Sequence, residues 1–316
     1  MTITPLRNNG KMDGNVLQAP AERKQNVSVT SESYLVGLIG EGITQSLTPP
    51  MHEREADQHG LRYLYRPIDL TSTGRPAHDV GELLRQGRDL GFNAFNITHP
   101  CKQLALEHLD DISADARRLG AVNTVLIRDG KMIGHNTDFS GFGTALAGGL
   151  PGAGQDSVVQ LGTGGAGAAV AYALLKAGTR TLTLMDLDAD RATERAETLS
   201  QFFPEQQVRT VGMADLAGVL DGADGLVNAT PVGMHSHPGL PLDVELLKPR
   251  HWVADVVYRP VETEMIAAAA AKGCRVLDGG HMAVGQAADA FGLITGLTPD
   301  ASRMRAHFLE LLAQGR

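Results

Sequence analysis

Two ionisable residues, Lys102 and Asp138, each close a short polar segment that follows an apolar run. Lys102 ends the segment of residues 96–102, and Asp138 ends the segment of residues 134–138. Two polar strand ends that converge on a cleft would bring this amine and this carboxylate together. Such a pair can relay the proton that a substrate hydroxyl releases when its carbon loses a hydride. The alternative is that both side chains are solvated surface residues.

A glycine-rich turn at residues 162–167 has the spacing of a dinucleotide-binding site. It follows the apolar run at residues 157–161 and precedes an alanine-rich segment, so the order is strand, turn and helix. Glycines let the backbone turn and approach a pyrophosphate, and the helix N-terminus offers free N–H groups to the phosphates. The alternative is a tight turn without a ligand. We assign to the cofactor Gly162, Gly164, Gly165, Ala166 and Gly167.

The acidic residue expected at the end of the following strand is Asp186, 19 positions after Gly167. Its carboxylate would accept hydrogen bonds from the adenosine ribose hydroxyls and would repel a 2′-phosphate. Asp188 and Asp190 follow closely and add negative charge, although one of them is expected to cap the next helix. The pattern favours NAD over NADP. Arg191 leaves the choice open, because it could stack on the adenine or reach a phosphate.

Alternating strand and helix patterns surround these groups and predict an α/β fold. Before residue 138, the patterns predict strands at 34–40, 61–68 and 91–97, helices at 79–90 and 104–119, and a hairpin of strands 122–127 and 132–135. After it, they predict strands at 157–161, 181–185, 225–228 and 252–257, and helices at 142–150, 168–177, 189–202, 284–291 and 301–313.

A length of 316 residues favours two domains. We expect an N-terminal α/β substrate-binding domain (residues 34–138 and 281–316), a Rossmann-type NAD-binding domain (residues 139–280) and a cleft between them. Residues 1–33 are polar and lack the apolar stretch of a secretory signal, which predicts a flexible tail whose role stays open.

The overall composition excludes several classes of protein. A net charge of −8 argues against nucleic acid or an anionic membrane as the main partner, and no apolar run approaches a membrane span. The two cysteines, Cys101 and Cys274, have no metal-ligand spacing and favour a reducing compartment, which points to the cytoplasm. His235 and His237 lack acidic or cysteine partners at ligand spacing, so we expect no metal site.

Several segments together resemble the shikimate dehydrogenase family, and within it the NAD-dependent quinate/shikimate dehydrogenase branch. The likeness runs from Tyr34 to near the C-terminus. Residues 37–52 are similar to the family's substrate-binding opening, residues 96–102 to the segment with its catalytic lysine, and residues 120–124 to an Ala-Val-Asn-Thr segment that holds ring hydroxyls. Residues 136–138 resemble the motif with the second catalytic residue, residues 228–234 a loop against the cofactor, and residues 258–260 and 280–286 cleft-lining segments.

The resemblance implies a role for each matching residue. Lys102 would accept the proton of the C3 hydroxyl of quinate or shikimate, with Asp138 orienting it, and NAD would take the hydride. The residues implied to bind the substrate are Ser46, Thr48, Thr98, Asn123, Thr137, Tyr258 and Gln286. The further residues assigned to the cofactor are Thr230, Pro231, Val232, Gly233, Met234, Val256, Gly279 and Met282.

Two departures from the biosynthetic members of the family favour NAD and the use of quinate as well as shikimate. Thr48 stands where the opening usually has a second serine, and Asp186-Leu-Asp188 stands where a phosphate-binding sequence is usual. His99 and Cys101 replace apolar residues, and we expect them to be packing variants.

Three hypotheses follow: an NAD-dependent quinate/shikimate dehydrogenase, an NADP-dependent biosynthetic shikimate dehydrogenase, and a non-catalytic paralogue that senses a ligand and a nucleotide. The expected partners are small-molecule substrates, and the chain would be a monomer or a homodimer.

Overall fold

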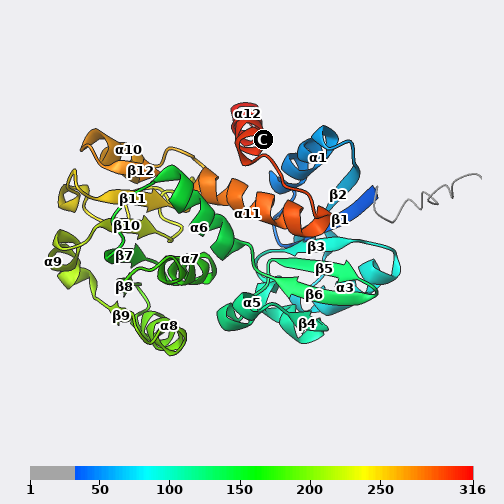
Figure 1. The fold of residues 1–316 in the computed structure, drawn as a ribbon, viewed down its shortest axis with the longest axis horizontal. Coiled ribbons are helices and arrows are strands. Elements are labelled where there is room, and N and C mark those ends of the chain that lie inside the picture. Colours follow the sequence, from blue (N-terminus) through cyan, green and yellow to red (C-terminus); the bar gives the residue numbers. More distant parts are fainter. Residues whose placement is uncertain (1–32, 316) are drawn as a thin grey trace, which may run out of the picture.

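The computed structural model describes residues 33–315 as two six-stranded sheets with helices packed around them (Figure 1). The predicted α/β fold is therefore confirmed. The predicted N-terminal tail lies outside the described residues, apart from Ser33, which begins the first strand. Within the described part of the chain, every helix is too short or too polar to cross a membrane.

The first sheet has the strand order β2-β1-β3-β5-β6-β4. β1 pairs in parallel with β2 and β3, whereas β5 is antiparallel to both of its neighbours. The strands are β1 (Ser33–Gly40), β2 (Arg62–Asp69), β3 (Ala94–Ile97), β4 (Asp111–Ile112), β5 (Thr124–Arg128) and β6 (Lys131–His135). The helices are α1 (Thr48–Gln58), α2 (Leu70–Thr73), α3 (Val80–Asp89), α4 (Cys101–Leu104) and α5 (Ala114–Leu119), with 3₁₀ turns at Ala77–Asp79 and Leu106–His108.

The predicted hairpin forms as β5 and β6. Asp129 and Gly130 both have positive φ, at 51° and 75°, as a tight two-residue hairpin turn requires. β5 begins directly after Asn123 and β6 ends directly before Asn136. The hairpin therefore brings the chain back to the end of the sheet at which it started.

The single helix predicted over residues 104–119 is wrong. The chain instead breaks into α4, a 3₁₀ turn, the short strand β4 and α5. β4 is held at the edge of the sheet because the Asp110 amide donates to the Met132 carbonyl at 2.9 Å and the Met132 amide donates to the Asp110 carboxylate at 2.7 Å. Ser113 then caps α5. Strand pairing thus outweighs the helical spacing of the apolar residues.

The second sheet is parallel throughout, with the order β12-β11-β10-β7-β8-β9. This is the strand order of a doubly wound dinucleotide-binding sheet. The strands are β7 (Ser157–Leu161), β8 (Thr181–Met185), β9 (Gln207–Thr210), β10 (Gly225–Asn228), β11 (Trp252–Asp255) and β12 (Arg275–Leu277). The helices are α7 (Gly165–Lys176), α8 (Ala189–Phe202), α9 (Leu216–Asp221) and α10 (Glu264–Ala271), with 3₁₀ turns at Met213–Asp215 and Val244–Leu246.

The edge strands β9 and β12 were not predicted from the sequence. β9 is mostly exposed and β12 has three residues, so neither carries the apolar run by which a buried strand is recognised.

Three further helices, α6 (Asp138–Gly149), α11 (Gly279–Thr295) and α12 (Ala301–Ala313), link the two sheets. In Figure 1, α6 and α11 lie side by side between the sheets, and α12 lies near α1. A Cβ added at Gly141 would lie 2.3 Å from the Gln286 amide nitrogen, so glycine permits the close approach of α6 and α11. Both helices begin earlier than predicted, which places Met282 and Gln286 on one helix. The predicted domain boundaries at residues 138 and 281 stay a prediction.

Candidate active site

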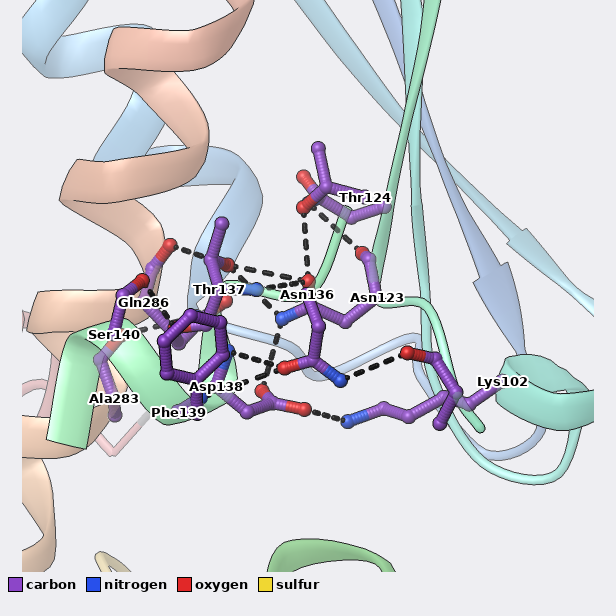
Figure 2. A network of polar contacts seen from close by, with 12 residues as sticks. Lys102, Asn123, Thr124, Asn136, Thr137, Asp138, Phe139, Ser140, Ala283 and Gln286 are labelled. Carbon is purple, nitrogen blue, oxygen red and sulfur yellow. Dashed lines mark hydrogen bonds and ion pairs between the residues drawn. The ribbon is translucent and has the colours of Figure 1, made fainter. Parts of the chain in front are cut away.

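Lys102 and Asp138 meet, as the sequence predicts. Lys102 lies in α4 just beyond β3, and Asp138 is the first residue of α6 just beyond β6. The Nζ atom of Lys102 donates to Oδ2 of Asp138 at 2.5 Å (Figure 2). The two side chains are only 26% and 13% exposed, so the ion pair is largely shielded from water. The structure thus holds an amine and a carboxylate in a fixed mutual position.

Asn123 fixes the orientation of Asp138. Its side-chain amide donates to Oδ1 of Asp138 at 2.9 Å and to the Thr137 hydroxyl at 3.0 Å, while its carbonyl oxygen accepts the Thr137 amide at 2.7 Å (Figure 2). Asn136 completes the turn by accepting the Asp138 amide at 3.0 Å. With Lys102 bonded to one carboxylate oxygen and Asn123 to the other, the Asp138 side chain cannot rotate without losing a hydrogen bond.

A cleft of about 320 Å³ opens over this pair and is lined by residues of both sheets and the linking helices. Its wall is rich in neutral hydrogen-bonding groups. The predicted substrate residues that line it are Ser46, Thr48, Thr98, Asn123, Tyr258 and Gln286, and the predicted cofactor residues that line it are Ala166, Val256, Gly279 and Met282. The catalytic pair, most of the predicted substrate residues and four of the predicted cofactor residues therefore meet at one cavity.

Thr137 is the predicted substrate residue that does not line the cleft. It is buried, and its hydroxyl donates to the main-chain carbonyl of Gln286 at 3.0 Å. This bond joins the start of α6 to α11, so in the structure Thr137 positions Asp138 and Gln286.

The glycine turn has the geometry of a phosphate cradle. Gly162 has φ of 89°, and a Cβ there would lie 2.7 Å from the Ala229 carbonyl oxygen. A Cβ at Gly167 would lie 2.3 Å from the Gly162 carbonyl oxygen. By contrast, a Cβ at Gly164 or Gly165 would meet nothing within 4 Å. Gly162 and Gly167 are therefore required by the fold, while Gly164 and Gly165 face open space at the N-terminus of α7.

Asp186 follows β8 and bonds back to the glycine turn. Its Oδ2 accepts the Thr163 amide at 2.8 Å and the Thr163 hydroxyl at 2.7 Å, and its Oδ1 accepts a hydrogen bond from Arg191 at 2.5 Å. Burial alone would raise the pKa of Asp186, but the bonds from Arg191 and Thr163 hold that pKa well below its usual range. The carboxylate is thus ionised. Asp188 caps α8, as expected for one of the neighbouring acids.

The loop of residues 230–234 lies against the glycine turn, since Thr230 is one of the nearest neighbours of the Cβ position at Gly162. Asn228 braces this loop by accepting the Thr230 hydroxyl at 2.6 Å and donating to the Val232 carbonyl at 3.0 Å. Asn228 also donates to buried Asp255 at 3.0 Å. Asp186, Arg191 and residues 230–234 do not line the cleft over Lys102.

Sequence reasoning missed Asp255, Gln45 and Arg259. Burial raises the pKa of Asp255 to about 6, against hydrogen bonds from Val257, Thr263 and Asn228 that lower it. Asp255 ends β11, and a polar residue at a strand end was the available signal. Gln45 and Arg259 line the cleft within segments that were matched to the family, but neither was assigned a role.

The expectation that His99 and Cys101 are packing variants is correct only for Cys101. Cys101 is fully buried in the core of the first sheet, whereas the His99 side chain is exposed.

Comparison with known proteins supports one family. The family model of the shikimate dehydrogenase substrate-binding domain matches residues 38–125. A shikimate dehydrogenase (NADP(+)) of Pseudarthrobacter chlorophenolicus is 68% identical over 91% of this chain and 98% of its own length. A quinate/shikimate dehydrogenase (NAD(+)) of Corynebacterium glutamicum is 50% identical over 89% of this chain and all of its own length.

The fold agrees with solved structures. Quinate dehydrogenase from Corynebacterium glutamicum in complex with NAD superposes with a TM-score of 0.85 at 50% identity, covering 88% of this chain and 99% of that one. Shikimate 5-dehydrogenase from Thermus thermophilus in complex with NADP(H) and shikimate has a TM-score of 0.77 at 37% identity, covering 87% and 98%. These matches extend over both sheets. The chain therefore belongs to the shikimate dehydrogenase family, whose members are oxidoreductases that act on a CH–OH group.

Proposed function

We propose that this protein is an NAD-preferring dehydrogenase that interconverts the C3 hydroxyl of quinate or shikimate and the corresponding ketone. The observation that carries the proposal is the Lys102–Asp138 pair, held at 2.5 Å in a cleft that is also lined by Ala166 of the glycine turn. A proton-handling pair and a dinucleotide cradle on the same cavity are what such a reaction requires.

Neutral side chains in the cleft suit a cyclic acid with several hydroxyls. Ser46, Thr48, Thr98 and Tyr258 offer hydroxyls, while Asn123 and Gln286 offer amides that both donate and accept. A ring with hydroxyls on successive carbons can engage such groups one by one, which fixes the reacting carbon relative to Lys102.

Lys102 handles the proton in this proposal. For oxidation, the Lys102 ammonium of the ion pair first gives up a proton to solvent. As the substrate carbon then gives up a hydride, the hydroxyl hydrogen passes to the Lys102 amine, and the C–O bond becomes a carbonyl. The ammonium that forms is stabilised by the Asp138 carboxylate, which Asn123 holds in place. In the reverse direction the same ammonium returns the proton to the oxygen. Nicotinamide dinucleotide, when bound, supplies the hydride acceptor or donor.

The dinucleotide would be held by the glycine turn and the loop of residues 230–234. Gly164 and Gly165 leave room for the pyrophosphate at the N-terminus of α7, and Val256, Gly279 and Met282 would contact the nicotinamide end, since they line the cleft next to the catalytic pair. Met234 is 39% exposed and would cover the same end.

The preference for NAD rests on Asp186. Its ionised carboxylate lies at the end of β8, where the ribose of a bound dinucleotide would lie, and it would accept hydrogen bonds from the ribose hydroxyls while repelling a 2′-phosphate. Its firm anchoring to Thr163 makes it unable to turn away without losing two bonds.

NADP is the second candidate, supported by two observations. Arg191 is 49% exposed and carries a guanidinium beside Asp186 that could bind a 2′-phosphate. The relative at 68% identity is named as an NADP(+) enzyme, whereas the one at 50% is named as an NAD(+) enzyme.

We also propose a cytoplasmic location, because Cys101 and Cys274 are both buried free thiols, as suits a reducing compartment. The alternative of a non-catalytic paralogue is disfavoured by the intact Lys102–Asp138 pair.

Initial rates with quinate and shikimate, each with NAD and NADP, test the proposal. We expect activity on both acids and a higher kcat/KM with NAD. Equal or better rates with NADP would overturn the cofactor preference. No turnover in any of the four mixtures, together with binding of substrate and dinucleotide by calorimetry, would favour the non-catalytic paralogue.

A further inference from the structure

Three charged residues line the cleft: Lys102, Asp138 and Arg259. Lys102 and Asp138 form an ion pair, so their charges largely offset each other. Arg259 has no carboxylate within 4.0 Å among residues 33–315, and its guanidinium carries a charge that no protein environment removes. The described part of the cleft therefore has one unbalanced positive charge.

Arg259 reaches across the cleft from the loop after β11 to the loop after β1. Its Nη2 donates to the Gln45 main-chain carbonyl at 2.9 Å. Its Nε atom is buried and has no hydrogen-bond partner, so a donor of this side chain is left unused. The contact of Nη2 with Gln45 is exposed, so the second N–H of Nη2, and not the buried Nε, is open to an acceptor that arrives with the ligand.

The contact with Gln45 places the guanidinium beside the hydroxyl-rich segment of the cleft. Gln45 directly precedes Ser46, whose hydroxyl accepts the Thr48 amide at 3.3 Å. Tyr258 directly precedes Arg259 and also lines the cleft. Three hydroxyls and one guanidinium therefore stand within a few residues of each other along two facing loops.

A carboxylate substrate needs more than neutral partners here. The chain has a net charge of −8, which disfavours the approach of an anion. Hydroxyls supply hydrogen bonds without charge, whereas a bond from a guanidinium to a carboxylate is about twice as strong as a neutral one. Arg259 is the group positioned to supply that charge.

We infer that Arg259 is a specificity-determining residue that selects the carboxylate of the substrate over an uncharged group of the same shape. This inference rests on the proposed function. It differs from a purely structural role, in which Arg259 only ties the loop after β11 to Gln45. A structural strap would affect acid and uncharged substrates alike, whereas charge recognition affects the acid alone.

The test compares shikimate with its primary amide, which keeps the shape and removes the charge. Steady-state rates at saturating dinucleotide are measured for the wild type, for Arg259→Gln and Arg259→Lys, and for Arg66→Gln as a control. Arg66 is exposed on β2, so its replacement changes the net charge equally without touching the cleft.

We expect Arg259→Gln to lower kcat/KM for shikimate by about 10- to 100-fold, the range of a lost hydrogen bond to a charged group. Most of the change should fall on KM, with kcat and the KM for the dinucleotide close to wild type. The amide should be nearly unaffected, so the preference for acid over amide collapses. Arg259→Lys, which keeps the charge, should retain most of that preference, and Arg66→Gln should match the wild type.

Equal losses of kcat/KM on acid and amide in both Arg259 variants would show that Arg259 only ties the loop after β11 to Gln45. Rates equal to those of Arg66→Gln would show that Arg259 has no role. Either result overturns the inference. A raised KM for the dinucleotide alone would assign Arg259 to the cofactor and overturns it as well. A wild type that turns over neither quinate nor shikimate rejects the proposed function first, and this outcome is recognised before any variant is made.

Discussion

At the scale of single residues, the arrangement around Asp138 shows how a few neutral groups can hold a reactive pair. Asn123 touches Asp138 and Thr137 with one amide nitrogen, and Lys102 takes the remaining carboxylate oxygen. Since Asn123 directly precedes β5, its position is set by the sheet. The pair is therefore preorganised before any substrate enters, which reduces the reorganisation that the reaction requires.

Replacing Lys102 with Ala should lower kcat by about 10²- to 10⁴-fold, because the proton of the hydroxyl loses its acceptor. Substrate binding should persist, since the neutral groups of the cleft remain. Stopped-flow and equilibrium binding measurements separate the two effects. The matched control is Lys131→Ala, which removes an exposed lysine of the hairpin. A kcat near that of the control would contradict the role of Lys102.

Asp186→Ala should reduce the preference for NAD over NADP, measured as the ratio of the two kcat/KM values, by about tenfold or more, because the ribose hydroxyls lose an acceptor and a 2′-phosphate loses a repelling charge. Arg191 would be freed at the same time and could approach the phosphate. Asp190→Ala, at an exposed position of α8, is the charge-matched control. An unchanged ratio in Asp186→Ala would show that the preference lies elsewhere.

At the scale of elements, the turn between β7 and α7 separates two uses of glycine. Gly162 is needed for the backbone conformation of the turn, because its positive φ and its contact with Ala229 exclude a side chain. Gly164 leaves the space above the turn open, since no protein atom lies within 4 Å of its Cβ position. A sequence pattern alone treats these glycines as equivalent.

We predict that alanine at Gly162 lowers stability, whereas alanine at Gly164 weakens dinucleotide binding. Gly162→Ala should lower the free energy of unfolding by about 1–3 kcal/mol through backbone strain. Gly164→Ala should change stability by less than about 1 kcal/mol, while weakening dinucleotide binding at least about tenfold, because its methyl group enters the pyrophosphate space. Urea denaturation and titration with the reduced dinucleotide measure the two quantities. Similar stability losses in both variants would contradict this division.

Helix and strand patterns were predicted well where one element buries a continuous apolar face. β1, β7, β8 and α8 lie within a residue or two of their predicted bounds. The single helix predicted over residues 104–119 was wrong because the backbone of residues 110–112 pairs with β6. Local spacing of apolar residues does not reveal such a partner.

At the scale of the whole molecule, the C-terminal helix α12 closes against the first sheet through α1. Glu55 of α1 is almost fully buried and bonds to Arg303 of α12 at 2.6 Å. Although burial alone would raise the pKa of Glu55, bonds from Arg303, the Asp300 amide and His59 hold that pKa below its usual value. Apolar residues of both helices, among them Met51 and Phe308, bury together beside this pair.

Arg303→Met should lower the free energy of unfolding by about 2–4 kcal/mol at pH 7, somewhat less than for a fully buried pair, because Arg303 is partly exposed. Since the pKa of Glu55 is depressed in the folded state, the stabilisation is present above the unfolded pKa and is lost as the pH falls through the lower, folded-state pKa. The difference between wild type and variant should therefore shrink towards low pH.

Urea denaturation at several pH values measures this difference. Glu55→Gln/Arg303→Met completes a double-mutant cycle and should be more stable than Arg303→Met alone, because no buried charge remains without its partner. A difference that is constant from pH 7 to pH 3 would argue that Arg303 acts through packing only.

The sequence by itself determined the local elements and the chemical types of the site. Glycine spacing, the acid after β8 and the polar strand ends at Lys102 and Asp138 are local patterns, and local patterns follow from backbone sterics and burial. This information was sufficient for the α/β class and for the candidate groups.

Only the tertiary structure decided which groups meet. It brings Lys102 to Asp138 across 36 positions of the chain, turns Thr137 towards α11 and sets Arg259 against Gln45, 214 positions away. It also buries Asp255 against Asn228, the residue that braces the loop at residues 230–234. Such contacts depend on how sheets and helices pack, which is fixed by the burial of many residues at once and not by the spacing of any few.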